Sequence, residues 1–348
     1  MEQQEKSLAG NRFITMGEVM MRLTPPNYEK LKNATTFGIT YGGAEANVAA
    51  ALANLGVDAT FFSVVPDTAL GKAAIRYLRS NDVHCSPCIY AQGGRLGIYY
   101  LEEGFGVRSS KVFYDRKGSA FSRYDYSQVD FEKILKGFTW LHMSGITPAL
   151  SQNCRDLTMY ALKAAKDLGL TVSFDCNFRS ALWGWQEARD CITTYLPYID
   201  VLFGIEPLNL RDENGVDMKD ALPPYPSYKE QDRIFRELHN RYNFKAIGRH
   251  LRYVHSGSEN SLKAFMWYNG ETFESNLFRF SILDRVGGGD AFASGMIFGM
   301  MREMDPDTLV NFAVASSVIK HTMHGDFNIT DDEESIKTLM NQNYDIKR

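Results

Sequence analysis

The sequence has no long apolar run, few cysteines and no excess of charge of one sign. No uninterrupted apolar stretch approaches the roughly 20 residues that span a bilayer, and the polar N-terminus contains no apolar signal core. Lysine and arginine total 38, aspartate and glutamate total 42, and the net charge of −4 offers no basic surface for nucleic acid. Five cysteines in 348 residues are too few for a disulfide scaffold. We therefore expect a cytoplasmic protein that binds neither nucleic acid nor membrane.

Segments with strand-like and helix-like patterns alternate along most of the chain. Such alternation is typical of a three-layer α/β fold, in which helices cover both faces of a mostly parallel central sheet and ligands bind beyond the carboxyl ends of the strands. We expect a single domain over 1–348. The expected strands include Arg12–Met16, Ala59–Val65, Leu170–Asp175, Val201–Phe203 and Phe244–Ile247, and the expected helices include Ala44–Leu55, Ala69–Ser80 and Asp156–Leu168.

Two segments, about 17–41 and 96–117, do not fit this alternation. The first contains adjacent prolines and no helical stripe, and the second has two strand-like runs around Glu102–Gly106, a pattern typical of a hairpin. We interpret both as parts of a small β-rich lid over the ligand site. Exposed strand edges in such a lid favour pairing with a neighbouring chain, which predicts a homo-oligomer formed through the lid.

The most informative motif is Asp284–Phe292, which joins a strand-like run to an apolar helix. Gly287, Gly288 and Gly289 allow backbone conformations closed to other residues, so that N–H groups converge on an anion at the positive end of the helix. Asp290 lies at the same point. A carboxylate beside an anion cradle suits a base that takes a proton from a hydroxyl while the cradle stabilises a phosphoryl group in transfer.

A glycine triplet between a strand and a helix also occurs for close packing alone, and this one has neither Walker-loop nor G-x-G-x-x-G spacing. The stretch does resemble D-T-x-G-A-G-D, a signature of the ribokinase-like (pfkB) carbohydrate kinases, with Arg285 in place of Thr and Gly288 in place of Ala. Gly42–Asn47 resembles the family's sugar-contacting G-G-x-x-x-N element, although a simple helix start explains it equally well. The resemblance implies a ribokinase-like fold and phosphoryl transfer from ATP with Mg²⁺.

Tyr114 and Arg116 are two residues apart in a strand-like run, so their side chains lie on the same face of the strand. A phenol beside a guanidinium suits an anionic polyol, because arginine binds carboxylate bidentately. A solvated arginine beside a packed tyrosine is the alternative. Further motifs resemble one branch of the family, the 2-keto-3-deoxygluconate (2-dehydro-3-deoxygluconate) kinases; they are Gly97–Tyr99, the strand with Tyr114 and Arg116, Asp175–Arg179 before Leu182 and Trp183, and Lys320–Asn328.

The resemblance implies a role for each matching residue. Asp290 is the base, and Gly287, Gly288 and Gly289 form the anion hole. The implied sugar-acid contacts are Gly43, Asn47, Tyr99, Tyr114, Arg116, Arg179, Asp290 and Asp326, and the implied ATP contacts are Asn177, Arg179, Gly257, Gly287, Gly288 and Gly289.

The metal-binding region departs from the family pattern. Family members carry an N-x-x-E element that orders Mg²⁺ through water, whereas Ile205 and Leu208 stand at the Asn and Glu positions here. Glu206 is a candidate substitute through water, and ATP itself also holds Mg²⁺. The nucleotide edge, Gly248–Asn260, is longer than in the family, so the alignment of Gly257 is not fixed. A requirement for a monovalent cation stays open.

The sequence thus favours an ATP-dependent kinase that phosphorylates the terminal hydroxyl of 2-keto-3-deoxygluconate to give the 6-phosphate. A kinase for a neutral ketose such as fructose is one alternative, since a neutral sugar would not need the cation of Arg116. A non-catalytic sensor of a sugar acid or nucleotide on the same fold is the other, motivated by the altered metal motif.

Overall fold

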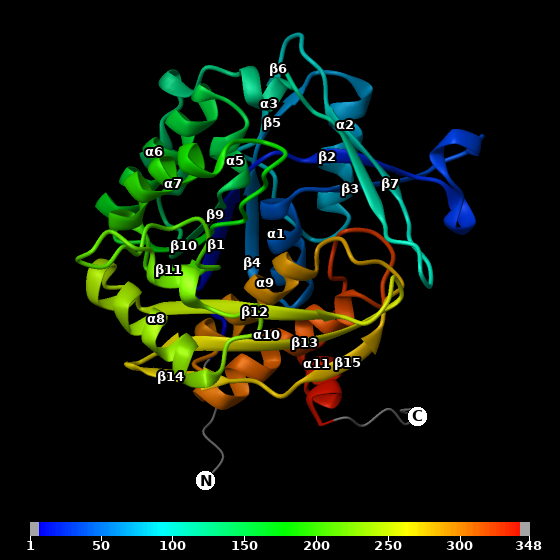
Figure 1. Ribbon diagram of the computed structural model, residues 1–348. Helices are drawn as coiled ribbons and strands as arrows, with labels where there is room; N and C mark the ends of the chain where they lie inside the picture. The colour runs from blue at the N-terminus through cyan, green and yellow to red at the C-terminus, as the bar shows by residue number, and fades with distance from the viewer. Residues whose placement is uncertain (1–6, 342–348) are drawn as a thin grey trace.

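The computed structural model describes residues 7–341, and a nine-stranded sheet forms the centre of that part of the chain (Figure 1). Its parallel strands follow the order β4, β1, β9, β10, β11, β12, and β13, β14 and β15 join antiparallel beyond β12. The chain leaves β1 for β4 on one side and later returns to β9 on the other, so the carboxyl end of β1 is a topological switch point, where α/β folds bind ligands. The strands are β1 (Arg12–Met16), β4 (Asp58–Phe62), β9 (Trp140–Ser144), β10 (Thr171–Asp175), β11 (Val201–Phe203), β12 (Ala246–Val254), β13 (Glu259–Tyr268), β14 (Glu271–Glu274) and β15 (Phe278–Ser281).

Helices cover both faces of this sheet, as Figure 1 shows for α6, α7 and α8 on one side and α1 and α9 on the other. Successive strand residues point to opposite faces, so Phe13 lies in one hydrophobic core and Ile14 in the other. The first core packs α1 (Ala44–Asn54), α2 (Ala69–Arg79), α9 (Gly288–Met301), α10 (Pro306–Lys320) and α11 (Glu333–Met340); the second packs α3 (Ala120–Arg123), α4 (Phe131–Leu135), α5 (Ile146–Ala149), α6 (Gln152–Asp167), α7 (Trp185–Tyr195) and α8 (Tyr228–Tyr242).

The predicted three-layer, mostly parallel α/β architecture is confirmed. Helices α1 and α2 begin where predicted and end one residue earlier. Strand β12 is longer than the predicted Phe244–Ile247, because its second half pairs with β13 in a long hairpin. Within residues 7–341, no helix combines the length and the apolar character that crossing a membrane requires.

A separate four-stranded sheet stands beside the carboxyl ends of the parallel strands and is called the lid sheet below. Its order is β3, β2, β7, β8, with β2 and β7 parallel and both outer pairs antiparallel. All four strands come from the segments that the sequence assigned to a lid. They are β2 (Met20–Thr24), β3 (Gly38–Gly42), β7 (Gly97–Glu102) and β8 (Lys111–Asp115), and a two-stranded sheet of β5 (Val64–Pro66) and β6 (Ile89–Ala91) lies apart from them.

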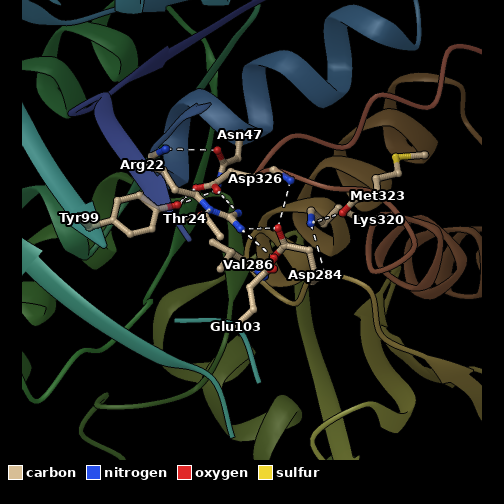
Figure 2. Close-up of polar contacts among 12 residues, drawn as sticks. Arg22, Thr24, Asn47, Tyr99, Glu103, Asp284, Val286, Lys320, Met323 and Asp326 are labelled. Carbon is tan, nitrogen blue, oxygen red and sulfur yellow. Dashed lines mark hydrogen bonds and ion pairs between the residues drawn. The ribbon is translucent and has the colours of Figure 1, made fainter. Parts of the chain in front are cut away.

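One buried arginine joins the lid sheet to two loops of the main body (Figure 2). Arg22 on β2 is 2% exposed. Its Nη2 lies 2.6 Å from an oxygen of Asp284, which opens the loop into α9, and its Nη1 lies 2.9 Å from an oxygen of Asp326, which follows α10. A carboxylate oxygen of Glu103 lies 3.4 Å from the same Nη2. The position of the lid sheet is therefore coupled to the glycine turn that precedes α9.

A second buried cation supports the same loops. Lys320 Nζ donates hydrogen bonds of 3.4 Å to the carbonyl oxygens of Asp284 and Met323, as Figure 2 shows. Burial lowers the pKa of Lys320. Burial also acts to lower the pKa of Arg22. The charges of Asp284 and Asp326 outweigh this effect and raise the pKa above its usual value, so Arg22 stays charged. Arg22, Lys320, Asp284 and Asp326 form a buried cluster that is held together by charge as well as by hydrogen bonds.

Replacing Arg22 with Met should destabilise the fold strongly, because it leaves the carboxylates of Asp284 and Asp326 buried without their partner. We expect the free energy of unfolding to fall by about 3–5 kcal/mol in urea denaturation followed by circular dichroism. Arg279→Met is the control, since that arginine pairs with Glu259 at an exposed site and should cost less than about 1 kcal/mol. Equal losses in the two variants would show that the Arg22 cluster does not hold the lid sheet in place.

Candidate active site

A cavity of about 840 Å³ lies where the carboxyl ends of the parallel strands, the lid sheet and the start of α9 meet. Segments that directly follow three parallel strands contribute to its wall: Glu18 after β1, Cys176–Arg179 after β10 and Gly204–Glu206 after β11. This is the edge at which ligands bind in open α/β sheets. The cavity is also large enough for a small molecule with several functional groups.

The glycine turn closes one end of this cavity. Gly287 has φ +84°, in the left-handed region, and a Cβ there would come within 2.0 Å of the Asp326 carbonyl oxygen. A Cβ at Gly288 would come within 2.3 Å of the His321 ring. Helix α9 begins at Gly288 without a side-chain cap, so its first N–H groups have no partner within the helix. The turn therefore presents free backbone donors to the cavity, as an anion site requires.

Asp290 lies in the first turn of α9 and lines the cavity. Asn47 on α1 donates a 2.6 Å hydrogen bond from Nδ2 to Asp290 Oδ2, which fixes the orientation of the carboxylate. Burial raises the pKa of Asp290 to about 6, against the lowering effects of the Asn47 hydrogen bond and the nearby Arg179. A carboxylate with a pKa near neutrality is suited to accept and release a proton.

Two further carboxyl groups, buried Glu45 and half-buried Asp175, line the same cavity, and sequence reasoning did not single them out. Glu45 accepts hydrogen bonds from the hydroxyls of Ser144 and Thr147, each of 2.8 Å. Burial, with a further contribution from the charge of Asp290, raises the pKa of Glu45 and of Asp175 to about 7. Glu45 lies inside the Gly42–Asn47 motif, so its place in the motif was the available signal.

Tyr99 and Asp326 form the wall on the side of the lid sheet. The hydroxyl of Tyr99 donates to Asp326 Oδ1 at 2.6 Å, and Arg22 holds the same oxygen (Figure 2). Tyr114 pairs with Tyr99 across β8 and β7, and the ring centroids are 5.8 Å apart. Tyr99, Tyr114 and Asp326 thus lie together, as the sequence predicted, whereas the contribution of Arg22 was missed because no local pattern marks it.

Arg116 lines the cavity, but it is not a free cation. Its Nε donates a 2.8 Å hydrogen bond to Glu18 Oε2, and its Nη2 forms a second contact with the same oxygen. The other oxygen of Glu18 is buried without a hydrogen-bond partner. The pair therefore offers both a guanidinium edge and a carboxylate acceptor to a polyhydroxylated ligand. The sequence predicted the arginine and missed the glutamate.

The opposite wall carries residues that the sequence assigned to the nucleotide. Asn177 has φ +36°, and its N–H donates to Asp175 Oδ1 at 2.9 Å. Arg179 is exposed to the cavity and forms no ion pair within residues 7–341. Arg249, His250, Arg252 and Arg285 line the same wall, and only Arg285 was noticed in the sequence, as a substitution in the glycine motif.

Residues of the altered metal motif take two different positions. Ile205 and Leu208 are buried in the hydrophobic core, so neither position supplies an oxygen ligand. Glu206 lines the cavity, and one of its oxygens lies 3.6 Å from Lys219 Nζ. In the described part of the chain, one group of potential metal ligands lies close together, Glu103, Asp284 and His324, and Arg22 already pairs with both of its carboxylates.

Gly257 is the one predicted site residue that does not line the cavity. It lies in the turn between β12 and β13, and its N–H donates a 2.6 Å hydrogen bond to the carbonyl oxygen of Gly106 at the tip of the lid hairpin. Ser258 accepts a 2.7 Å hydrogen bond from the N–H of Gly106. This position favours a contact with the lid over a contact with a nucleotide. The predicted residues that do line the cavity are Gly43, Asn47, Tyr99, Tyr114, Arg116, Asn177, Arg179, Glu206, Gly287, Gly288, Gly289, Asp290 and Asp326.

Comparison with known proteins agrees with this geometry. The chain is 32% identical to 2-dehydro-3-deoxygalactonokinase of Haloferax volcanii over 94% of this chain and 96% of the relative, and 27% identical to 2-dehydro-3-deoxygluconokinase of Thermoproteus tenax over 90% and 89%. The crystal structure of 2-dehydro-3-deoxygluconokinase from Thermotoga maritima is 38% identical, with a TM-score of 0.87, over 95% of this chain and 99% of that one. The model of the pfkB family carbohydrate kinases matches residues 11–221. With its sheet order, its glycine turn and the aspartate at the start of α9, the chain belongs to the pfkB family of carbohydrate kinases.

Proposed function

We propose that the protein transfers the terminal phosphoryl group of ATP to the terminal hydroxyl of a 2-keto-3-deoxy sugar acid, with 2-keto-3-deoxygluconate as the leading substrate and its 6-phosphate as the product. The relatives that support this substrate class are named for the gluconate-derived acid and for its galactonate-derived epimer. The epimers differ in the direction of one hydroxyl, so both belong in the assay.

The position of Asp290 is the observation that carries the proposal. Its carboxylate lies one residue after the glycine turn, lines the cavity and has a pKa raised to about 6. A fixed anion site alone gains nothing from a neighbouring carboxylate, because like charges repel. A kinase needs this arrangement, since the acceptor hydroxyl loses its proton as the cradle stabilises the transferred group.

In this reaction, each group of residues that lines the cavity has a role. The hydroxyl oxygen forms a bond to the γ-phosphorus, the bond from that phosphorus to the bridging oxygen breaks, ADP leaves, and Asp290 accepts the proton. The N–H groups of Gly287, Gly288 and Gly289 donate to the transferred group, and the uncapped start of α9 fits an anion there. Asn177 and Arg179 bind the nucleotide phosphates. Mg²⁺ would arrive with ATP, and Glu206, which lines the cavity, would contact it through water.

The sugar acid occupies the wall formed by the lid sheet. Arg116 orients its carboxylate together with Arg179, which bridges the acid and the nucleotide phosphates, while Tyr99, Asp326 and the unpartnered oxygen of Glu18 bind hydroxyl groups. Because Glu18 neutralises part of the charge of Arg116, the acid is held by hydrogen-bond geometry as much as by net charge. The lid sheet covers this part of the cavity and excludes water, which suppresses hydrolysis of ATP.

An assay of ADP release with a panel of acceptors tests the proposal. We expect turnover with 2-keto-3-deoxygluconate or its galactonate-derived epimer, and little with ribose, fructose or adenosine. Asp290→Asn should lower kcat by about 10²–10⁴-fold while binding of both substrates persists. A preference for fructose would favour the neutral-ketose kinase. Binding without turnover in the unaltered protein would favour the non-catalytic sensor.

The pH dependence of the reaction follows from the pKa of Asp290. Protonated Asp290 cannot accept a proton, so kcat/KM should rise with pH through about 6 and level off above it. Rate measurements between pH 4 and pH 9 locate this rise, the acidic limb of the pH profile, with thermal unfolding at each pH as the control for stability. A limb near pH 4, the ordinary range of a carboxyl group, would show that burial does not tune this residue or that another group is the base.

We also propose that two copies of the chain associate through the outer face of the lid sheet. Leu23 pairs with Ile39 and with Tyr100, and Tyr100 pairs with Phe113, so one apolar row crosses all four strands. Ile39 is 57% exposed and Phe113 is 46% exposed. The opposite face carries Tyr99 and Tyr114 toward the cavity. An exposed apolar face on a sheet with free edges is typical of an association surface.

Light scattering after size-exclusion chromatography tests this surface. The unaltered protein should have at least twice the chain mass, and Ile39→Lys combined with Phe113→Lys should reduce it to one chain, because two charges would be buried without partners. Leu168→Lys, an exposed leucine at the end of α6, is the control and should leave the mass unchanged. A monomeric unaltered protein, or a double variant that keeps its mass, would refute the proposal.

A further inference from the structure

Six of the nine residues of β12 extend beyond the parallel sheet, and this part of the strand passes along the cavity. Only Ala246, Ile247 and Gly248 pair with β11, whereas the rest of the strand pairs with β13 alone. Arg249, His250 and Arg252 of this extension line the cavity. The longer nucleotide edge noted in the sequence therefore becomes a wall that brings arginines to the ligand site.

Four arginines on this wall, Arg179, Arg249, Arg252 and Arg285, line the cavity, and within residues 7–341 none of them forms an ion pair. Arg249 differs from the other three, because its Nη1 donates a 2.7 Å hydrogen bond to the side-chain oxygen of Gln231. The Nε atoms of Arg252 and Arg285 are buried and have no hydrogen-bond partner. Other buried arginines of the protein are paired: Arg22 with Asp284 and Asp326, Arg116 with Glu18, and Arg189 with Asp217.

Unpaired guanidinium groups in a partly buried wall are costly, because they lose hydration without gaining a partner. Burial lowers the pKa of Arg252, and repulsion from Arg285 and Arg179 lowers it further. The repulsion shows that the three groups are close enough to act on one another. An anion with several negative charges would satisfy all three at once.

The location of the arginines identifies the kind of anion. Arg285 lies two residues before Gly287, so the arginines flank the backbone donors of the anion site. The wall that we assign to the sugar acid contains Tyr99 and Tyr114 and belongs to the lid sheet, whereas Arg252 belongs to the main sheet. An anion that spans from the glycine turn along β12 must be extended, as a chain of phosphates is.

We propose that Arg252 and Arg285, together with Arg179, bind the phosphate chain of the phosphoryl donor and neutralise its charge. The assignment to a donor rests on the proposed kinase function, but the anion site itself does not. Arginine suits this task because its planar group binds phosphate oxygens bidentately and remains charged. Ile205 and Leu208 supply no oxygen ligand for a metal. Arginines are the residues of this wall that carry a fixed positive charge.

Isothermal titration with inorganic tripolyphosphate, ATP and adenosine tests the site. Arg252→Met and Arg285→Met should each raise the Kd of tripolyphosphate and of ATP by about 10- to 100-fold and leave the Kd of adenosine unchanged. Arg279→Met removes the same charge from an exposed ion pair and is the matched control; it should change none of the three. Because each site variant removes a cation without a partner, the thermal midpoint of the ligand-free protein should stay equal or rise.

The outcomes separate this inference from the kinase proposal. If tripolyphosphate binds through Arg252 and Arg285 but no sugar acid is phosphorylated, the anion site stands and the kinase proposal fails. If the protein phosphorylates a sugar acid and both variants keep the Kd of tripolyphosphate and the KM of ATP, the inference is wrong. A rise in the KM of the sugar acid alone would also overturn it, because the arginines would then bind the carboxylate.

Discussion

The placement of a carboxylate beside free backbone donors is the constraint on which the site depends. Asp290 and the glycine turn belong to one helix start, and the turn has its shape because a Cβ at Gly287 or Gly288 would collide with the loop after α10. Burial then raises the pKa of Asp290, and Asn47 orients its carboxylate. Close packing of the backbone thus leaves free donors at the turn and raises the pKa of the carboxylate that we propose as the base.

The rest of the cavity is arranged around this helix start by charge. Arg22 links the lid sheet to Asp284 and Asp326, on the two loops that shape the turn. The position of the lid sheet is therefore coupled to the backbone donors of the glycine turn. The wall formed by the lid sheet contains charges that are already paired, as in Arg116 with Glu18, whereas the wall formed by β12 contains arginines without acidic partners. This contrast supports our proposal that the acceptor binds a neutralised, hydroxyl-binding surface and the donor a strongly cationic one.

The sequence was informative where function is encoded locally. The strand, glycine turn and helix of Asp284–Phe292 form a continuous segment, so the position of Asp290 in the cavity could be predicted, as could the strands of the lid sheet with Tyr99 and Tyr114. Contacts between residues that are separated by long stretches of chain could not be predicted from the sequence. Arg22 and Asp326 are 304 residues apart, and no periodic pattern connects Glu18 with Arg116 or Arg252 with Arg285. Gly257 was assigned by motif, but the length of the β12–β13 hairpin carries it to the lid tip instead.

A crystal structure with a non-hydrolysable ATP analogue and 2-keto-3-deoxygluconate would test the central claim most directly. The account predicts that the terminal hydroxyl of the acid lies within hydrogen-bonding distance of the Asp290 carboxylate, and that the terminal phosphate accepts hydrogen bonds from the N–H groups at Gly287–Gly289. A complex in which the acceptor hydroxyl lies against another group, or in which the phosphate lies away from the start of α9, would contradict it.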